Sequence, residues 1–211
     1  MNLWHDFITN KGKPIHKLAN YFPVYERYFS PWRNRSLTFI EIGVWKGGSL
    51  GMWQRYFGPM AKIVGIDINP ECKQHEAPGI FVRIGDQKDN RFLDSILNEF
   101  GTPDIVLDDG SHQQADVYAT YEYIYPLMGK NSIYMVEDVQ CGYWPEYRGN
   151  GKHFLQEGKA GVDDLNADLS RGAVTPNYFT RQTYAISFYA GMVVFEKGDV
   201  FNKESMMTGA G

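Results

Sequence analysis

The sequence predicts an α/β fold built on a doubly wound parallel sheet with right-handed crossovers. From residue 37 onward, short apolar runs of β type alternate with segments of helical periodicity. Several of these runs end abruptly in acidic side chains, as strands do at the ligand-binding edge of an open α/β sheet. Two last runs, 184–189 and 192–195, are separated by a turn containing glycine and predict an antiparallel hairpin.

The elements follow in chain order. Before the core, the spacing of Leu18, Tyr21, Tyr25 and Phe29 predicts a helix over residues 16–28 that covers one edge of the sheet. Strands are expected at 37–42, 61–66, 80–84, 104–107 and 132–136, with helices at 49–57, 89–100 and 116–127 between them. We therefore expect an N-terminal helical and aromatic cap (1–36), a core domain (37–201) and a flexible tail (202–211).

Within the core domain, residues 139–182 form a long segment rich in glycine, tyrosine and charge, with one helical stretch at 162–169. A connection of this length in a compact domain is usually a lid or a binding loop. We expect it to form the acceptor loop of an active site.

Composition narrows the class of protein. The 211 residues suffice for one α/β domain, and the net charge of -4 argues against a nucleic-acid partner. No apolar run approaches the ~20 residues that span a bilayer, and the N-terminus lacks the pattern of a signal peptide. Two isolated cysteines predict neither a disulfide framework nor a zinc site. We expect a cytoplasmic protein without a membrane partner.

Two apolar runs end in paired carboxylates. Asp108 and Asp109 follow the first run, with His112 close behind, and Glu137 and Asp138 follow the second. Acids gathered at one sheet edge repel one another, and a divalent cation offsets this most simply. Mg²⁺ suits such oxygen ligands, whereas one histidine without cysteine is a poor set for Zn²⁺. The alternative is that one or two of these acids cap helices.

A glycine-rich turn follows the strand at 37–42 and opens the next helix. Its spacing is G-x-x-x-G-G, so the dinucleotide fingerprint is absent. Asp67 ends the second strand, where an acid can accept hydrogen bonds from ribose hydroxyls, and Asp86 ends the third, where it can meet an adenine amine. The alternative roles are a helix cap for Asp67 and a turn residue for Asp86.

Together, E-x-G-x-x-x-G at 41–47, the acids Asp67 and Asp86 and the terminal hairpin resemble class I S-adenosylmethionine-dependent methyltransferases over about residues 37–198. The resemblance implies a seven-stranded sheet of order 3-2-1-4-5-7-6. It also implies a methionine subsite at the glycine turn, a ribose contact at Asp67 and an adenine contact at Asp86. The cofactor-binding residues so implied are Glu41, Gly43, Gly47, Ser49, Asp67, Asp86, Gln87 and Asp108.

A narrower resemblance rests on D-D-G-S-H at 108–112, V-E-D at 136–138, the Tyr-Trp-Pro loop at 143–145, and the segments 163–166 and 187–198. These motifs are similar to those of metal-dependent sugar O-methyltransferases of macrolide antibiotic pathways (mycinamicin and tylosin type), and in part to cephalosporin hydroxylase-like proteins. The resemblance implies Asp109, Glu137 and Asp138 as ligands of Mg²⁺, with Asp109 and His112 as catalytic residues and His112 as the base. It also implies an acceptor pocket shaped by Tyr143 and Trp144.

We therefore expect an S-adenosylmethionine-dependent, Mg²⁺-assisted O-methyltransferase that acts on a hydroxyl of a sugar or glycosylated small molecule. A homo-oligomer is compatible with this expectation. Three alternatives stay open: a catechol-type metal-dependent O-methyltransferase, a non-catalytic cofactor-binding subunit and, given the glycine spacing, least of all a nicotinamide dehydrogenase. The acceptor loop has its own alternative, in which Trp144 and Tyr147 only pack a lid.

Overall fold

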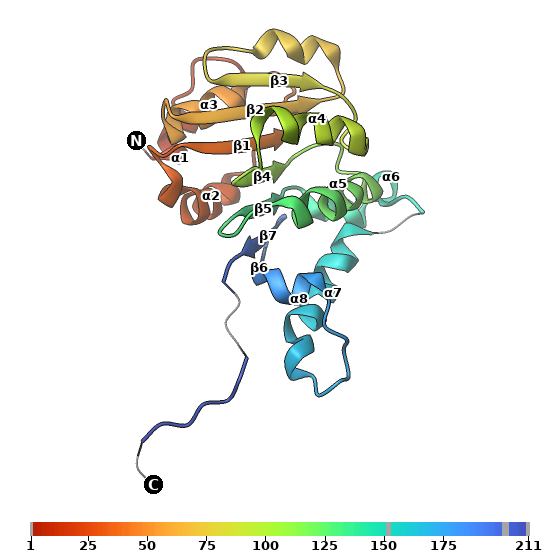
Figure 1. Ribbon diagram of the computed structural model, residues 1–211. Helices are drawn as coiled ribbons and strands as arrows, with labels where there is room; N and C mark the ends of the chain where they lie inside the picture. The colour runs from red at the N-terminus through yellow and green to blue at the C-terminus, as the bar shows by residue number, and fades with distance from the viewer. Residues whose placement is uncertain (1, 151–152, 200–202, 210–211) are drawn as a thin grey trace.

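The computed structural model describes residues 2–150, 153–199 and 203–209. At its centre lies one seven-stranded sheet of order β3-β2-β1-β4-β5-β7-β6, which confirms the predicted order (Figure 1). Strands β1 to β5 pair in parallel, whereas β7 pairs antiparallel with both β5 and β6. The strands are β1 (Leu37–Ile42), β2 (Ala61–Asp67), β3 (Ile80–Ile84), β4 (Ile105–Asp108), β5 (Ile133–Val136), β6 (Thr183–Tyr189) and β7 (Met192–Lys197).

Helices cover both faces of the sheet, because alternate strand residues point to opposite sides. Phe39 of β1 joins a core with α1 (Leu3–Ile8), α2 (Phe22–Phe29) and α3 (Gly48–Phe57). Its neighbour Ile40 joins the opposite core with α4 (Asn90–Phe100), α5 (Gln114–Leu127) and α7 (Phe154–Asn166). Shorter elements are η1 (Ala19–Tyr21), η2 (Ser30–Trp32), η3 (Pro70–His75), η4 (Val139–Tyr143), α6 (Pro145–Arg148), η5 (Ala167–Leu169) and α8 (Tyr178–Gln182).

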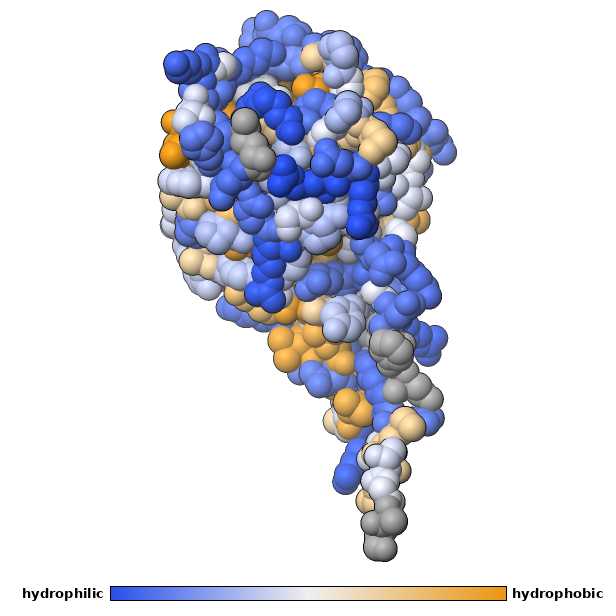
Figure 2. Space-filling model, turned by 90° about the vertical axis from the view of Figure 1, so that its left-hand side faces the viewer, coloured by the Kyte–Doolittle hydropathy of each residue, from blue (hydrophilic) through white to orange (hydrophobic). Residues whose placement is uncertain are grey.

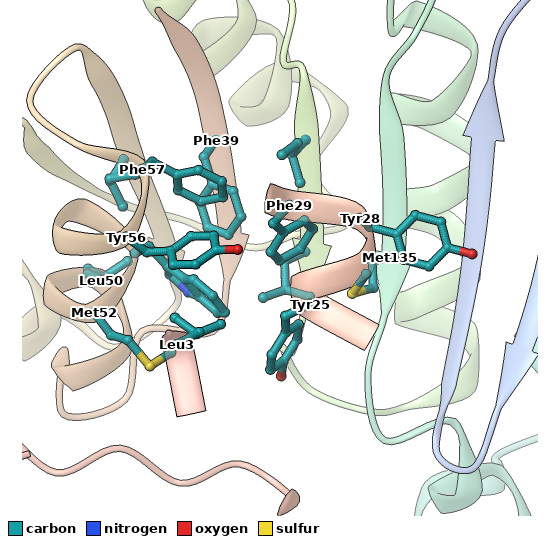
Figure 3. Packing of buried hydrophobic residues seen from close by; sticks show 14 of the residues in the cluster. Leu3, Tyr25, Tyr28, Phe29, Phe39, Leu50, Met52, Tyr56, Phe57 and Met135 are labelled. Atoms are coloured by element: carbon teal, nitrogen blue, oxygen red, sulfur yellow. The ribbon is translucent and has the colours of Figure 1, made fainter. Parts of the chain in front are cut away.

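Aromatic side chains dominate the core beneath α2 and α3 (Figure 3). The Phe29 ring lies 5.8 Å from Phe39 and 5.6 Å from Trp53, both near right angles, which is a favourable edge-to-face arrangement. The packing fixes α2 and α3 on this face of the sheet. Both helices adjoin the N-terminal segment of residues 9–18, which reaches the carboxyl ends of the parallel strands.

The N-terminal region differs from the helix predicted over 16–28. Residues 9–18, called the N-terminal strap below, are not helical, and α2 begins only at Phe22 after the short η1. Pro23 lies in the first turn of α2, where its missing N–H costs nothing, so it marks a helix start. The spacing of Tyr21, Tyr25 and Phe29 predicts the buried face correctly but not where the helix begins. Helix α1 was not predicted.

The segment 139–182 is more helical than predicted, because it contains η4, α6, α7, η5 and α8. The predicted stretch at 162–169 corresponds to the end of α7 together with η5. Glycine has a low helix propensity, so Gly161 argues against a helix when the sequence alone is considered. In the structure a Cβ at position 161 would lie 2.6 Å from the Ile186 side chain, so glycine allows α7 to pack closely on β6. Of the predicted tail, residues 202, 210 and 211 lie outside the described residues, and 203–209 form no helix or strand.

Figure 2 looks along the sheet from the side where the parallel strands begin, opposite their carboxyl ends. Hydrophilic side chains cover most of this face, and hydrophobic ones gather below the main body. Among the described residues, no helix is long and apolar enough to cross a membrane.

Candidate active site

The sheet brings the acidic motifs to one edge. In register, Ile42 of β1 lies beside Asp108 of β4, and Asp108 lies beside Val136 of β5. The pairing continues past the strands, since Asp109 N donates to Ile42 O and Glu137 N donates to Asp108 O, each at 2.9 Å. Neighbouring parallel strands thus deliver the two acid pairs side by side.

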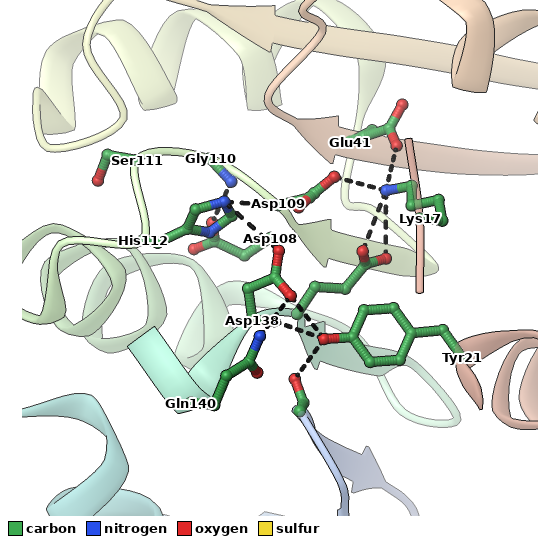
Figure 4. A network of polar contacts seen from close by, with 12 residues as sticks. Lys17, Tyr21, Glu41, Asp108, Asp109, Gly110, Ser111, His112, Asp138 and Gln140 are labelled. Atoms are coloured by element: carbon green, nitrogen blue, oxygen red, sulfur yellow. Dashed lines mark hydrogen bonds and ion pairs between the residues drawn. The ribbon is translucent and has the colours of Figure 1, made fainter. Parts of the chain in front are cut away.

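Asp109, His112 and Asp138 converge at this edge (Figure 4). His112 Nε2 lies 3.6 Å from Asp138 Oδ2 and 3.9 Å from Asp109 Oδ1. One ligand atom from each of the three residues lies within 4.8 Å of the others, and all three side chains are partly exposed. This arrangement is compact enough for a single metal ion.

The remaining oxygen of each aspartate is held by the protein. Asp109 Oδ2 lies 2.6 Å from Lys17 Nζ, and Asp138 Oδ1 accepts hydrogen bonds from the Tyr21 hydroxyl at 2.6 Å and Gln140 Nε2 at 2.9 Å. Each carboxylate is therefore oriented by one oxygen and presents the other toward His112. Two oriented carboxylate oxygens suit a hard divalent cation such as Mg²⁺, whose other positions water or substrate oxygens can fill. The donor set present fits that ion.

Two of the converging residues have left-handed backbone conformations, with φ of 57° at His112 and 53° at Asp138. Such conformations are uncommon for residues other than glycine and cost about 1–3 kcal/mol, so they often mark functional sites. Here they turn both side chains toward the same point at the ends of β4 and β5.

Glu137 does not face Asp109 and Asp138 as the third ligand of the predicted set. Its carboxylate is buried and turned toward Lys17 Nζ, 3.2 Å from both oxygens, and toward the Tyr25 hydroxyl, 2.5 Å from Oε1. Burial raises the pKa of Glu137, and the Lys17 ammonium group opposes that shift. The role of Glu137 as a metal ligand stays a prediction.

Asp108 is also buried, and its side chain points inward. Its oxygens accept a hydrogen bond from Gly110 N at 3.2 Å and approach Gln87 Nε2 and the Tyr134 hydroxyl at 3.4–3.5 Å. Burial raises the pKa of Asp108 to about 7, against the Gly110 hydrogen bond, while the nearby Asp109 charge adds to the rise. The structure thus places Asp108 under the loop that carries Asp109 and His112.

Two adjoining cavities open beside this cluster. The first has a volume of about 460 Å³ and is bordered by the N-terminal strap and the glycine turn, with Asp109, His112 and Asp138 at one side. The second, of about 220 Å³, lies at the ends of β2 and β3. Both are lined by Gly43, Asp67 and Gly110, so the two cavities adjoin at these residues.

The predicted cofactor residues distribute over these cavities. Gly43 and Ser49 line the first, Asp86 and Gln87 line the second, and Asp67 lines both. Glu41 is instead fully buried beneath the turn, where it accepts hydrogen bonds from Ser49, Trp53 and Lys17. Gly47 needs to be glycine, because its φ is 71° and a Cβ would lie 2.7 Å from His75 Cβ and closer still to His75 Cγ.

Asp67 holds the glycine turn as well as facing the cavities. Its Oδ2 accepts hydrogen bonds from Val44 N at 2.8 Å and Trp45 N at 3.1 Å, and its Oδ1 accepts one from Asn69 N at 2.8 Å. A carboxylate has about four acceptor positions, so with three in use about one remains for a ligand hydroxyl. The position is the one predicted for a ribose contact.

The predicted acceptor loop lies next to His112. Tyr143 and Trp144 are 67% and 45% exposed, and the Tyr147 ring lies 6.2 Å from His112 and 5.9 Å from Trp144. The partly buried Tyr147 ring thus lies between His112 and the exposed Trp144 ring. The role of Tyr143 and Trp144 in acceptor binding stays a prediction, as does the alternative of simple lid packing.

Three polar residues of the cluster were not predicted from sequence: Lys17, Tyr21 and Tyr25. Helical spacing alone assigned the tyrosines to a core and gave Lys17 no role. A signal was present, because four carboxylates at one edge require more than one positive charge to balance them. Lys17, four residues before Tyr21, was a candidate for that charge.

Comparisons with known proteins agree with the sequence resemblance, although no protein-family model matches the chain. Mycinamicin VI 2''-O-methyltransferase of Micromonospora griseorubida is 33% identical over 83% of this chain. Demethylmacrocin O-methyltransferase of Streptomyces fradiae is 32% identical over 91% of it. The chain spans 47% and 51% of the length of these two curated relatives.

A third relative, 8-demethyl-8-alpha-L-rhamnosyl tetracenomycin-C 2'-O-methyltransferase of Streptomyces olivaceus, is 38% identical over 63% of this chain and 36% of its own length. Among solved structures, the MycE methyltransferase of the mycinamycin biosynthetic pathway, in complex with Mg, SAH and mycinamycin VI, superposes with a TM-score of 0.80. It is 31% identical and is matched over 93% of this chain and 53% of its own.

Proposed function

Because this chain is similar in sequence and in fold to sugar O-methyltransferases of antibiotic pathways, we propose that it is an S-adenosylmethionine-dependent, Mg²⁺-assisted O-methyltransferase. Its acceptor would be a hydroxyl of a sugar or glycosylated small molecule. The observation that carries the proposal is the convergence of Asp109, His112 and Asp138 beside the two joined cavities. The similarity to MycE, solved with Mg and SAH, supports the choice of both ligands.

The cofactor would lie across both cavities. Asp86 and Gln87 would flank the adenine in the smaller cavity, and Asp67, at the junction, would accept hydrogen bonds from the ribose. Gly43 and Ser49 would border the methionine part in the larger cavity, next to the acidic cluster. This direction brings the reactive end of the cofactor toward His112.

When bound, S-adenosylmethionine supplies an electrophilic methyl group, and Mg²⁺ supplies a Lewis acid that makes an acceptor hydroxyl easier to deprotonate. Asp109 and Asp138 would hold the cation through the oxygens that they present toward His112. His112 would accept the hydroxyl proton as the oxygen bonds to the methyl carbon and the carbon–sulfur bond breaks. The electron pair of that bond remains on sulfur, so no acid is needed for the leaving group.

Mg²⁺ favours oxygen ligands over imidazole nitrogen, which leaves His112 available as the base rather than as a ligand. The left-handed backbone of His112 would then orient the imidazole toward the acceptor hydroxyl. Alignment of reacting groups of this kind can lower an activation barrier by ~7–11 kcal/mol. Tyr143 and Trp144 would contact the acceptor from the exposed side of the cluster.

Methyl-transfer assays with labelled S-adenosylmethionine test the proposal directly. We expect activity on glycosylated acceptors, loss of activity in excess chelator and recovery with Mg²⁺. Assays of sugar and catechol acceptors side by side distinguish a sugar O-methyltransferase from a catechol-type O-methyltransferase. Full activity in excess chelator would refute metal assistance.

His112→Asn tests the base, because asparagine tolerates the left-handed backbone at this position better than alanine does. We expect S-adenosylhomocysteine affinity to be retained and turnover to fall by ~10²-fold or more. Unchanged turnover would remove His112 from the mechanism. A thermal-shift comparison of S-adenosylhomocysteine with NAD separates a methyltransferase from a nicotinamide dehydrogenase.

We also propose a cytoplasmic location, no nucleic-acid partner and a homo-oligomer. The two cysteines, Cys72 and Cys141, are unpaired and buried, which fits a reducing compartment such as the cytoplasm. The acidic net charge of -4 offers no support for a nucleic-acid partner. A homo-oligomer remains part of the proposal, and light scattering of the purified chain measures it.

A further inference from the structure

Lys17 places an ammonium group among three acids at the strand ends (Figure 4). Its Nζ lies 2.6 Å from Asp109 Oδ2, 3.2 Å from Glu41 Oε1 and 3.2 Å from both oxygens of Glu137. The side chain is only 2% exposed, although it comes from the N-terminal strap rather than from a helix or strand. The three N–H groups of one ammonium ion are thus matched by three carboxylates.

This contact is ionic rather than neutral. Carboxylates of Asp109, Glu137 and Glu41 lie within hydrogen-bonding distance of the Lys17 nitrogen, and such neighbours favour the charged form of a lysine. Two of these acids, Glu41 and Glu137, are almost completely buried, so an unpaired charge on either would be costly. Lys17 therefore neutralises part of the acidic cluster in the absence of any other cation.

The same oxygens are the ones that a divalent cation would draw on. Asp109 is shared, with Oδ2 on Lys17 and Oδ1 toward His112 and Asp138. Glu137 is fully engaged, since both of its oxygens face Lys17. A cation at Asp109 and Asp138 would be repelled by the Lys17 charge, because only the Asp109 carboxylate separates the two. Glu137 could bind the cation only if its carboxylate left Lys17.

From this geometry we infer that Lys17 is an internal competitor of the divalent cation, which occupies part of the acidic cluster when no ion is bound and thereby lowers its affinity for Mg²⁺. The inference rests on the proposed function, which puts Mg²⁺ at Asp109 and Asp138. It assigns Lys17 as a positioning residue that acts through Asp109 and Glu137. The result would be a readily exchanged metal ion.

A purely structural role for Lys17 makes a different prediction. If the ammonium group only holds the N-terminal strap on the sheet through its ion pairs, its removal should destabilise the protein and leave Mg²⁺ affinity unchanged or weaker. Competition also predicts a less stable metal-free protein, because buried acids lose their counter-charge. Competition alone predicts tighter metal binding.

The test is Lys17→Met in the full chain, because methionine keeps most of the side-chain length without the charge. Titration calorimetry with Mg²⁺ alone should show an affinity increased by about tenfold or more, since a nearby positive charge is removed. Mg²⁺ should also raise the melting temperature of K17M more than that of the wild type. Lys17→Arg, which keeps the charge, should stay near the wild type.

Lys13→Met is the matched control. Lys13 lies on the same strap, but its Nζ is 3.1 Å from His75 Nδ1 and not at the acidic cluster. K13M should therefore leave Mg²⁺ affinity unchanged. A single cooperative transition in thermal unfolding followed by circular dichroism verifies that K17M is folded.

Equal or weaker Mg²⁺ binding by folded K17M overturns the inference alone. Absence of Mg²⁺ binding to both the wild type and K17M overturns the metal-assisted function and the inference with it. If K17M does not fold, the side-chain ammonium signal of Lys17 in nitrogen-15 NMR of the wild type replaces it. Competition predicts that saturating Mg²⁺ shifts this signal, and an unshifted signal would contradict it.

Discussion

Gly48→Ala offers a sensitive test of how the N-terminal strap closes the larger cavity. Gly48 is the first residue of α3, where alanine normally favours helix over glycine by up to ~1 kcal/mol. In this structure a Cβ at position 48 would lie 2.6 Å from Lys13 O and closer still to Pro14 O. Both atoms belong to the backbone of the strap, so the strap itself would have to move.

The expected magnitude follows from these opposing effects. Overpacking of this kind costs about 1–3 kcal/mol, which outweighs the gain in helix propensity. Gly51→Ala, on the same helix, is the matched control, because its Cβ would meet only the end of the Arg55 side chain at 3.4 Å. For a domain of this size, each kcal/mol shifts the melting temperature by about 2–4 °C. G48A should therefore melt several degrees below G51A.

Cofactor affinity provides the second measurement. Residues 14–17 of the strap line the cavity assigned to the methionine part, so a displaced strap should weaken binding of S-adenosylhomocysteine. We expect calorimetry to show a loss of about tenfold or more for G48A, equivalent to ~1.4 kcal/mol, and no loss for G51A. A G48A variant that melts as high as G51A and binds with full affinity would refute the described contact between strap and helix.

Three further predictions concern single residues around the site. Asp67→Asn should weaken S-adenosylhomocysteine binding by ~10–100-fold in calorimetry, because charge-assisted hydrogen bonds are lost; unchanged affinity would exclude the ribose role. Tyr25→Phe should lower the free energy of unfolding by about 1–3 kcal/mol, because the buried Glu137 loses a donor; an unchanged urea midpoint would contradict this. Burial raises the pKa of Cys72 and of Cys141 to about 11, so native alkylation should be slow near pH 7 and quicken as pH rises toward 11. S-Adenosylhomocysteine should protect Cys72, which lines the cavity, more than Cys141; rapid native labelling at pH 7 by mass spectrometry would oppose this.

Much of the sheet and its acidic edge could be predicted because both depend on local signals. The apolar runs before Asp67, Asp108 and Glu137 are short, rich in β-branched residues and end in acids, which is typical of buried parallel strands. The acids after β4 and β5 then meet because the sheet places these strands side by side. Sheet order came from the family resemblance, since periodicity alone does not fix it.

The parts that could not be predicted depend on long-range packing. Lys17 has no local pattern that assigns it to Asp109, which is 92 residues away in the chain. Glycines within α7 obscure its extent, and only the Ile186 side chain on β6 explains why Gly161 is favourable there. The direction of Glu137 was likewise set by Lys17, from the stretch wrongly predicted to be helical, and by Tyr25, whose helix was predicted but whose contact with Glu137 was not.

The hydrogen bonds of Tyr21 have a consequence for how the protein reaches its working state. Its hydroxyl bonds to Asp138 and lies 3.1 Å from Gly191 O, 170 positions further along the chain. Contacts of such separation carry a loop-closure entropy cost, so we expect this junction to form late in folding. During synthesis on the ribosome, Tyr21 must wait until Gly191 has been made before this junction can close.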